Sequence, residues 1–292
     1  MTNDGQVTGT ACLVNMGDGR AELGRAASIG RSGAGVILDL RILDWLTNES
    51  TAAKYHTLFT TLRSAPDRII DDTSGDFTMR GGQAVTEHWR KFPGLMVSGF
   101  GPLYLKHGAL EQFTCASLSR NQLDPTRPLY LADSGAAEFV AAWHDHYQLP
   151  RPDAHGHTDQ GMTPMNFEAH YPPAESGLTG LVHADVIASS GESAKPIVEC
   201  LAEIDRAGSP FSQIVMPIDR DTRRLQATLL ENGYQVFGYQ AASENTSAAL
   251  LYGKVSQGVP VVPTHWNHNQ TPNPFWQDDQ LRATAEAVAQ RW

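Results

Sequence analysis

Residues 224–239 read RLQATLLENGYQVFGY, and this stretch contains the most specific structural pattern in the chain. We expect a helix over residues 219–232 that ends at Gly233, because glycine readily takes the left-handed conformation found at helix C-termini. Residues 234–240 then predict a strand, and residues 211–218 form an apolar run typical of a buried strand. The stretch therefore predicts a strand–helix–strand unit of an α/β fold.

The same alternation extends across residues 127–255. We expect a strand at 129–132, a helix from Asp133 or Ser134 to Tyr147, and strands at 163–171 and 178–188. A turn with Gly191 leads to a helix at 192–207, and a last strand lies at 247–255. This order predicts a mixed central sheet flanked by helices.

The element order, together with the helix end at Gly233 and Tyr234, resembles the Gcn5-related N-acetyltransferase (GNAT) superfamily over residues 126–256. In that family a helix ends on a glycine, an aromatic residue follows, and a strand begins. The resemblance implies an acyltransferase that forms an amide from an activated acyl or aminoacyl donor and an amine. It also implies that two strands, here 181–188 and 213–218, splay apart so that the donor's pantetheine pairs with their main chain.

The resemblance also implies where the donor binds. Backbone N–H groups at a helix N-terminus can hold a pyrophosphate such as that of coenzyme A. The corresponding turn here consists of Ser189, Ser190, Gly191, Ser193, Ala194 and Lys195. Arg223 and Arg224 are a second candidate phosphate contact, or else part of a solvated helix face. The turn keeps one of the family's glycines, and Leu229 stands where the family usually has a tyrosine, so we keep both acyl-CoA and aminoacyl-tRNA as donors, with no tightly bound cofactor.

Aminolysis of an activated acyl group needs a base for the amine and a proton donor for the leaving group. His183 and Asp185 alternate onto one face of a predicted strand next to the expected acyl position. We expect His183 to act as the base, with Asp185 or Glu168 orienting or replacing it, and Tyr234 as a candidate proton donor. Packing is the alternative role for both His183 and Tyr234.

The rest of the chain predicts three further regions. Residues 1–34 are glycine-rich and predict a flexible leader, and residues 257–292 predict an arm rich in Pro, His and Trp followed by a helix. Residues 35–125 predict an additional α/β region, with a strand and helix over 36–46, a helix over 51–63 and a broken strand over 94–105. This region is either a degenerate second GNAT-like lobe or an unrelated domain.

The composition restricts the setting. The net charge of −10 argues against a broad nucleic-acid surface, so any contact with tRNA would be local. Three scattered cysteines fit a reducing cytoplasm, and no apolar run is long enough to span a membrane. We expect a cytoplasmic N-acyltransferase with a small-molecule amine acceptor in natural-product biosynthesis; the acceptor's identity and the oligomeric state stay open.

Two alternative functions stay open as well. The first is a non-catalytic GNAT-like module that binds a ligand or a protein. The second is a metal-dependent enzyme built on the loop that contains His144, His146, His155 and His157, because histidine is a common zinc ligand. The helix expected over 134–147 opposes the second alternative, since residues two apart on a helix point away from each other.

Overall fold

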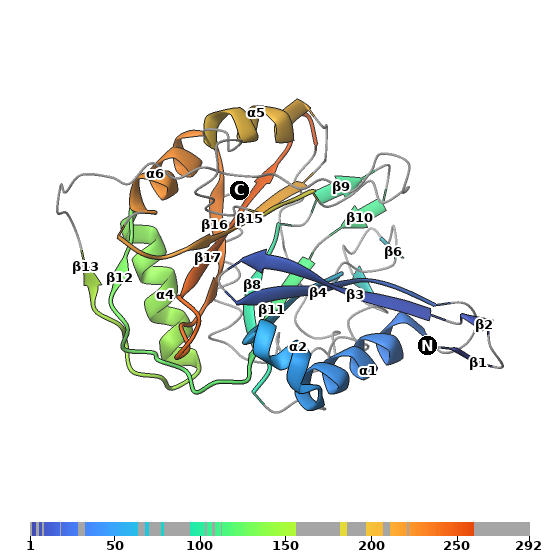
Figure 1. Cartoon of the computed structure of the whole chain (residues 1–292). Coiled ribbons are helices and arrows are strands. Elements are labelled where there is room, and N and C mark those ends of the chain that lie inside the picture. The colour runs from blue at the N-terminus through green and yellow to red at the C-terminus, as the bar shows by residue number, and fades with distance from the viewer. Residues whose placement is uncertain are drawn as a thin grey trace.

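The computed structural model describes the chain in segments: residues 2–3, 6–7, 9–17, 19–28, 33–63, 68–69, 77–78, 94–102, 104–106, 109–111, 113–155, 182–185, 197–206, 211–220 and 222–259. These residues form a mixed α/β structure with one large sheet and helices packed against it (Figure 1). The predicted α/β class is therefore confirmed.

Among the described residues, the large sheet has nine strands in the order β14-β15-β17-β16-β8-β11-β5-β4-β3. Two neighbouring pairs, β4–β5 and β14–β15, are parallel, and the other neighbours are antiparallel. The strand bounds are β3 Gly9–Gly17, β4 Arg20–Ser28, β5 Thr57–Arg63, β8 Met96–Phe100, β11 Phe113–Ser119, β14 Val182–Asp185, β15 Phe211–Pro217, β16 Gln235–Gln240 and β17 Ala249–Val255.

In the described part of the chain, short strands form four separate two-stranded pairs. These are β1 Thr2–Asn3 with β2 Gln6–Val7, β6 Arg68–Ile69 with β7 Phe77–Thr78, β9 Tyr104–Lys106 with β10 Ala109–Glu111, and β12 Leu129–Tyr130 with β13 Ala154–His155. The predicted break in the strand over 94–105 is confirmed, because β8 and β9 lie on either side of it.

The helices begin and end where local chemistry favours it. They are α1 Gly33–Thr47, α2 Glu49–Lys54, α4 Ser134–His146, α5 Ile197–Arg206 and α6 Arg223–Glu231. The Asp133 carboxylate caps α4 by accepting from the Ala136 N–H at 3.1 Å. Gly233 follows α6 with φ +82°, the left-handed conformation expected from the sequence. None of the helices that the structure describes has the length and apolar character needed to cross a membrane.

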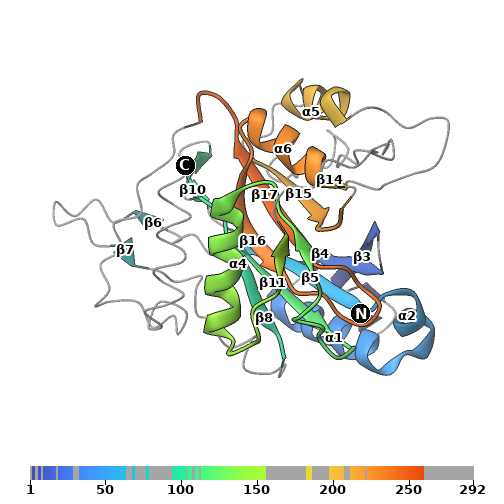
Figure 2. The ribbon, with the colours of Figure 1, turned by 90° about the vertical axis from the view of Figure 1, so that its left-hand side faces the viewer.

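The sheet contains one strand arrangement twice. In the first unit the strands lie in the order β4-β5-β11-β8, and in the second in the order β14-β15-β17-β16. Each unit runs along the chain as strand, helical segment, parallel strand and two antiparallel strands, and its last strand inserts between the two before it. Figure 2 shows β16 and β17 continuing into β8 and β11 as one sheet.

The two units also agree in register. The pairing of β8 with β11 skips Ser98, and the pairing of β16 with β17 skips Phe237, so each unit has a bulge at the equivalent place. The next residues, Gly99 and Gly238, pair with each other and join the units. Because equivalent residues meet in an antiparallel pair, a local two-fold axis passes between Gly99 and Gly238.

Only glycine fits at this junction. A Cβ on Gly99 would lie 2.1 Å from the Phe237 carbonyl oxygen. A Cβ on Gly238 would lie 2.8 Å from the Ser98 carbonyl oxygen and 2.5 Å from Leu251 Cδ1. Each glycine thus faces the bulge carbonyl of the other unit, as the two-fold relation requires.

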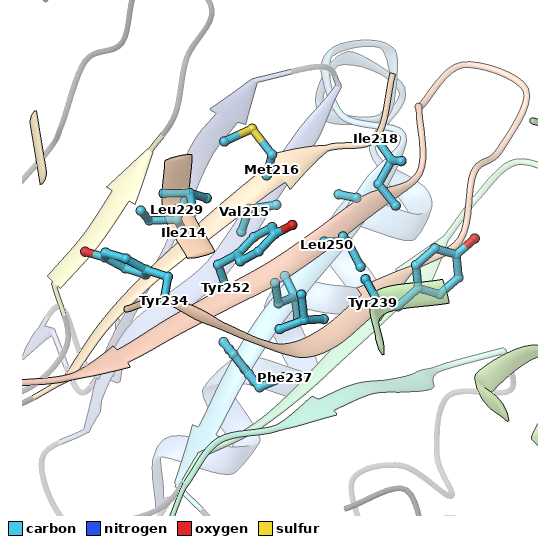
Figure 3. Packing of buried hydrophobic residues seen from close by; sticks show 14 of the residues in the cluster. Ile214, Val215, Met216, Ile218, Leu229, Tyr234, Phe237, Tyr239, Leu250 and Tyr252 are labelled. Carbon is cyan, nitrogen blue, oxygen red and sulfur yellow. The ribbon is translucent and has the colours of Figure 1, made fainter. Parts of the chain in front are cut away.

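The sheet has two different faces. One face carries Leu23, Ile214 and Tyr239, and the described helices pack on it, so we call it the helix-covered face. Figure 3 shows Ile214 of β15 beside Leu229 of α6 on this face. The residues that alternate with these point to the opposite side, which we call the inner face; it carries Arg20, Glu22, Thr57, Phe59, Ser98, Cys115, Ser117, Gln213, Phe237, Gln240 and Leu251.

Several predicted elements are wrong. Residues 9–28 of the expected flexible leader are the hairpin β3–β4, whose strand β4 lies between β3 and β5. Residues 36–46 belong entirely to α1, and the helix expected over 51–63 is the short α2 followed by β5. Thr57–Arg63 is a strand because its alternate residues fill both faces of the sheet, which outweighs its helical spacing. The strand expected at 163–171 and residues 260–292 of the expected arm and helix lie outside the described residues.

We predict that Gly99→Ala and Gly238→Ala each destabilise the protein by about 3 kcal/mol or more, because backbone and buried atoms occupy the space of the new methyl group. Urea unfolding monitored by circular dichroism measures this. The control is Gly258→Ala, where φ is +84° but no atom lies within 4 Å of the new Cβ. That change should cost about 1 kcal/mol through backbone strain alone. Equal losses of unfolding free energy in all three variants would contradict the close approach of the two main chains at Gly99 and Gly238.

Candidate functional site

Buried polar side chains gather on the inner face. This is unusual for a sheet interior, because a polar group removed from water loses free energy unless it finds a partner. The buried polar residues of this face are Arg20, Glu22, Thr57, Ser98, Ser117, Gln213 and Gln240. The helix-covered face has a mainly apolar core, and the inner face also carries buried apolar side chains, among them Phe59, Phe211, Phe237 and Leu251. We therefore take the inner face as the candidate functional surface.

The sheet curls so that the inner faces of the two units meet. Arg20 of β4 donates from Nε to Gln240 Oε1 of β16 at 3.1 Å, and its Nη2 donates to the Ser247 carbonyl. Cys115 of β11 donates from Sγ to Gln213 Oε1 of β15 at 3.8 Å. Neither contact joins neighbouring strands of the sheet. The inner face is therefore concave, and both units contribute polar groups to it.

Two buried amide groups on this face have unmet donors. Gln213 and Gln240 are each 1% exposed, and each has its Oε1 occupied by a donor from the other unit. Their Nε2 atoms are buried and have no hydrogen-bond partner. An unmet buried donor costs about 1–3 kcal/mol, so such groups are rare in a fold that needs nothing further.

His183 lies next to one of these amides in the sheet. Strand β14 pairs with β15 in parallel, and the register sets His183 opposite Gln213 and Asp185 opposite Val215. Paired positions on neighbouring strands belong to the same side of a sheet, so positions 183 and 185 belong to the inner face. In the first unit, Glu22 occupies the position equivalent to 183. Glu22 pairs with Phe59 in the same way as His183 pairs with Gln213.

The predicted splaying of these strands is not observed where both are described. Residues Val182 to Asp185 pair continuously with Ser212 to Val215. The four residue pairs place the two strands in ordinary parallel pairing, so the main-chain groups between them are used in the sheet here. Any separation of the two strands would have to begin after Asp185. Residues 186–188, Glu168 and the predicted donor turn, with Ser189, Ser190, Gly191, Ser193, Ala194 and Lys195, lie outside the described residues.

The Tyr234 side chain belongs to the helix-covered face and not to the inner face. Its hydroxyl accepts from Ser212 Oγ at 3.1 Å, its side chain is fully buried, and Lys254 Nζ lies 5.5 Å from its ring centroid. Ser212 alternates with Gln213 along β15 and so belongs to the helix-covered face. Figure 3 shows Tyr234 near Ile214 and Leu229 of this packed layer. The contacts assign Tyr234 to packing and separate it from the inner face.

The two arginines of α6 differ in their surroundings. Arg223 donates from Nε to the Leu131 carbonyl at 3.2 Å and so attaches α6 to the segment before α4. Arg224 is exposed on the same helix. Arg223 thus contacts the main chain of the β12–α4 connection, and its predicted phosphate contact stays a prediction.

His144 does not fit the metal hypothesis. It is fully buried, and both of its ring nitrogens are occupied: Nδ1 donates to the Pro150 carbonyl at 2.7 Å, and Nε2 accepts from the Tyr239 hydroxyl at 3.1 Å. Within the described segments no group of three or more His, Cys, Asp or Glu residues is arranged to hold a metal ion. His157 and the side chain of His155 lie outside those segments. A metal site in this loop would have to form without His144.

The sequence reasoning missed the polar residues of the inner face. Gln213 stands in the otherwise mainly apolar run FSQIVMP of residues 211–217, and this contrast was the available signal. Arg20 and Cys115 gave no signal, because each meets its partner across several strands. Comparison of the chain with models of known protein families gives no match, and comparison with curated protein sequences gives none either.

We predict a pH-dependent stability that arises at His144. Burial lowers the pKa of His144 below its ordinary value of 6.5, despite the opposing Pro150 carbonyl and Asp145 charge. Between the two pKa values the unfolded chain binds a proton that the folded protein does not. The stabilising contribution is therefore complete above about pH 6.5 and is lost as the pH falls towards the lower folded-state value.

Urea unfolding of wild type and His144→Gln from about pH 7.5 to about pH 5.5 measures this effect. The variant should lose less free energy of unfolding over this range than wild type. The control is Gln226→Met, which removes buried hydrogen bonds to the Ala132 N–H and the Tyr130 carbonyl; it should be less stable at every pH while keeping the wild-type slope. A His144→Gln slope equal to that of wild type would contradict the role of His144.

Proposed function

We propose that the chain is an N-acyltransferase that forms an amide between an activated acyl or aminoacyl donor and a small amine. The observation that supports this is the order β14-β15-β17-β16, with α5 between β14 and β15 and α6 between β15 and β16. The order of these elements along the chain is the one on which the resemblance to the GNAT superfamily rests. The repeated arrangement in β4-β5-β11-β8 favours the two-lobed variant of that fold over an unrelated N-terminal domain.

The proposed reaction takes place on the inner face of the second unit. There His183 acts as the base for the amine, with Asp185 two residues along the same strand or Glu168 to orient or replace it. Tyr234 is left out of the proposed mechanism, because its hydroxyl is held by Ser212 on the opposite face. The acceptor is a small molecule of natural-product biosynthesis in the cytoplasm.

The donor is either acyl-CoA or aminoacyl-tRNA. The turn proposed to hold its phosphate groups is the segment from Ser189 to Lys195, with Arg224 as an exposed additional cation. No cofactor need be tightly bound, since both donors enter as substrates. The net charge of −10 favours the smaller donor, because a tRNA would require a local basic surface on an acidic protein.

A second candidate function is a non-catalytic module that binds a ligand or protein through the inner face. The continuous pairing of Val182–Asp185 with β15 favours it, because the main-chain groups between these two strands pair with each other and leave no gap there for a pantetheine chain. This candidate keeps the concave polar surface but requires no base at position 183. Turnover measurements separate the two functions.

We predict that the full-length chain turns over acetyl-CoA or charged tRNA with a member of a panel of small primary amines, with the amide detected by mass spectrometry. His183→Ala should lower kcat by about 10²–10⁴-fold, the usual contribution of a positioned base. Tyr234→Phe is the matched control, and it should change kcat by no more than about twofold, because it touches no reacting group.

Isothermal titration with acetyl-CoA and with CoA decides the donor before the amine panel is tested. Micromolar binding selects acyl-CoA as the donor. If no heat of binding is detected, charged tRNA is tested next. Binding without turnover on either donor, together with an unchanged affinity in His183→Ala, would replace the acyltransferase by the binding module.

A further inference from the structure

We propose that Gln213 is the hydrogen-bond donor that holds the carbonyl oxygen of the acyl group, oriented for this task by Cys115 of the other unit. The inference rests on the proposed acyltransferase function and adds a residue that recognises the reacting group. Its structural basis is separate from that of the proposed function, because it depends on the amide of Gln213 and on the two-fold relation of the units.

The first argument is the unmet donor. Gln213 is 1% exposed, and its Oε1 accepts from Cys115 Sγ at 3.8 Å. This contact fixes the orientation of the amide, so Nε2 is presented as a donor with no partner of its own. A carbonyl oxygen of a bound molecule would supply the missing acceptor and remove the cost of the unmet group.

The second argument compares the two units. The two-fold relation matches each strand position of one unit with a position of the other. Counted along the strand pairing from the Gly99–Gly238 junction, Phe59 occupies the position that Gln213 has in the second unit. Leu251 likewise occupies the position that Cys115 has in the first. Phe59 and Leu251 are buried as completely as their counterparts. The same backbone positions therefore accept a fully apolar pair, and the fold itself does not need the polar pair in the second unit. The polar pair is best explained by a ligand.

The third argument is position. His183, the proposed base, pairs with Gln213 in the β14–β15 register, so the donor and the base belong to neighbouring positions of one face. An amine that attacks the carbonyl carbon forms a C–N bond and moves an electron pair onto the carbonyl oxygen. The Gln213 N–H stabilises that negative charge. When the C=O bond re-forms, the bond to the leaving thiol or alcohol breaks, and the leaving group takes the proton that the amine has lost.

A stability measurement without any acyl donor tests whether the unpaired Gln213 Nε2 destabilises the protein. Gln213→Met keeps the length of the side chain and removes the buried amide, so it should raise Tm by about 2–4 °C. The matched control is Gln226→Met. Gln226 is equally buried, but its Oε1 accepts from the Ala132 N–H at 3.2 Å and its Nε2 donates to the Tyr130 carbonyl at 3.0 Å. That variant should lower Tm. A lower Tm in Gln213→Met as well would overturn the proposal.

Two matched ligand pairs test the role of the carbonyl: acetyl-CoA with CoA, and charged with uncharged tRNA. Wild type should bind the acylated member of one pair more tightly by about tenfold, and Gln213→Met should bind both members equally. Its kcat should fall by about a hundredfold or more. If Gln213→Met keeps the preference and the kcat of wild type, this proposal fails while the acyltransferase stands. If wild type neither prefers an acylated ligand nor turns one over, both fail.

Discussion

The structure depends on the close approach of two main chains at Gly99 and Gly238. A Cβ on either glycine would meet a bulge carbonyl of the other unit, so the two units can be joined in this register only if both residues lack a side chain. The junction is short, since among the described residues β8 and β16 pair at these two glycines. A junction of one residue pair lets the sheet curl, and the curl brings Arg20 to Gln240 and Cys115 to Gln213. The concave face is therefore a consequence of the junction.

A repeated unit supplies the same backbone frame twice and lets the two copies diverge. The first copy has Phe59 at this position, and Leu251 occupies the position equivalent to Cys115; both are buried apolar residues, which is the ordinary solution for such positions. The second copy places Gln213 there and receives Cys115. Because both copies share register and bulge, the difference between them reflects side-chain chemistry and not backbone geometry. This comparison separates residues that the fold requires from residues that it merely tolerates.

The sequence predicted the second unit better than the first. The helix end at Gly233, the cap at Asp133 and the buried strand at 211–217 follow from local rules, and the structure has all three. The prediction of the first unit failed for a physical reason: residues 9–28 are glycine-rich, and β4 is a strand because it pairs with both β3 and β5. Thr57–Arg63 likewise forms a strand because it lies between two partners, which no local pattern reveals.

The candidate site was predictable only in part, because its parts come from distant segments. His183 was identified from its alternation with Asp185, and the register gives it a position on the inner face. Gln213 acquires its meaning from Cys115, which is 98 residues away in the chain and is not on a neighbouring strand. A glutamine in a buried strand looks unfavourable by composition alone. It becomes informative when its partner is known, because one half of the amide is then satisfied and the other half, Nε2, is a buried donor without an acceptor.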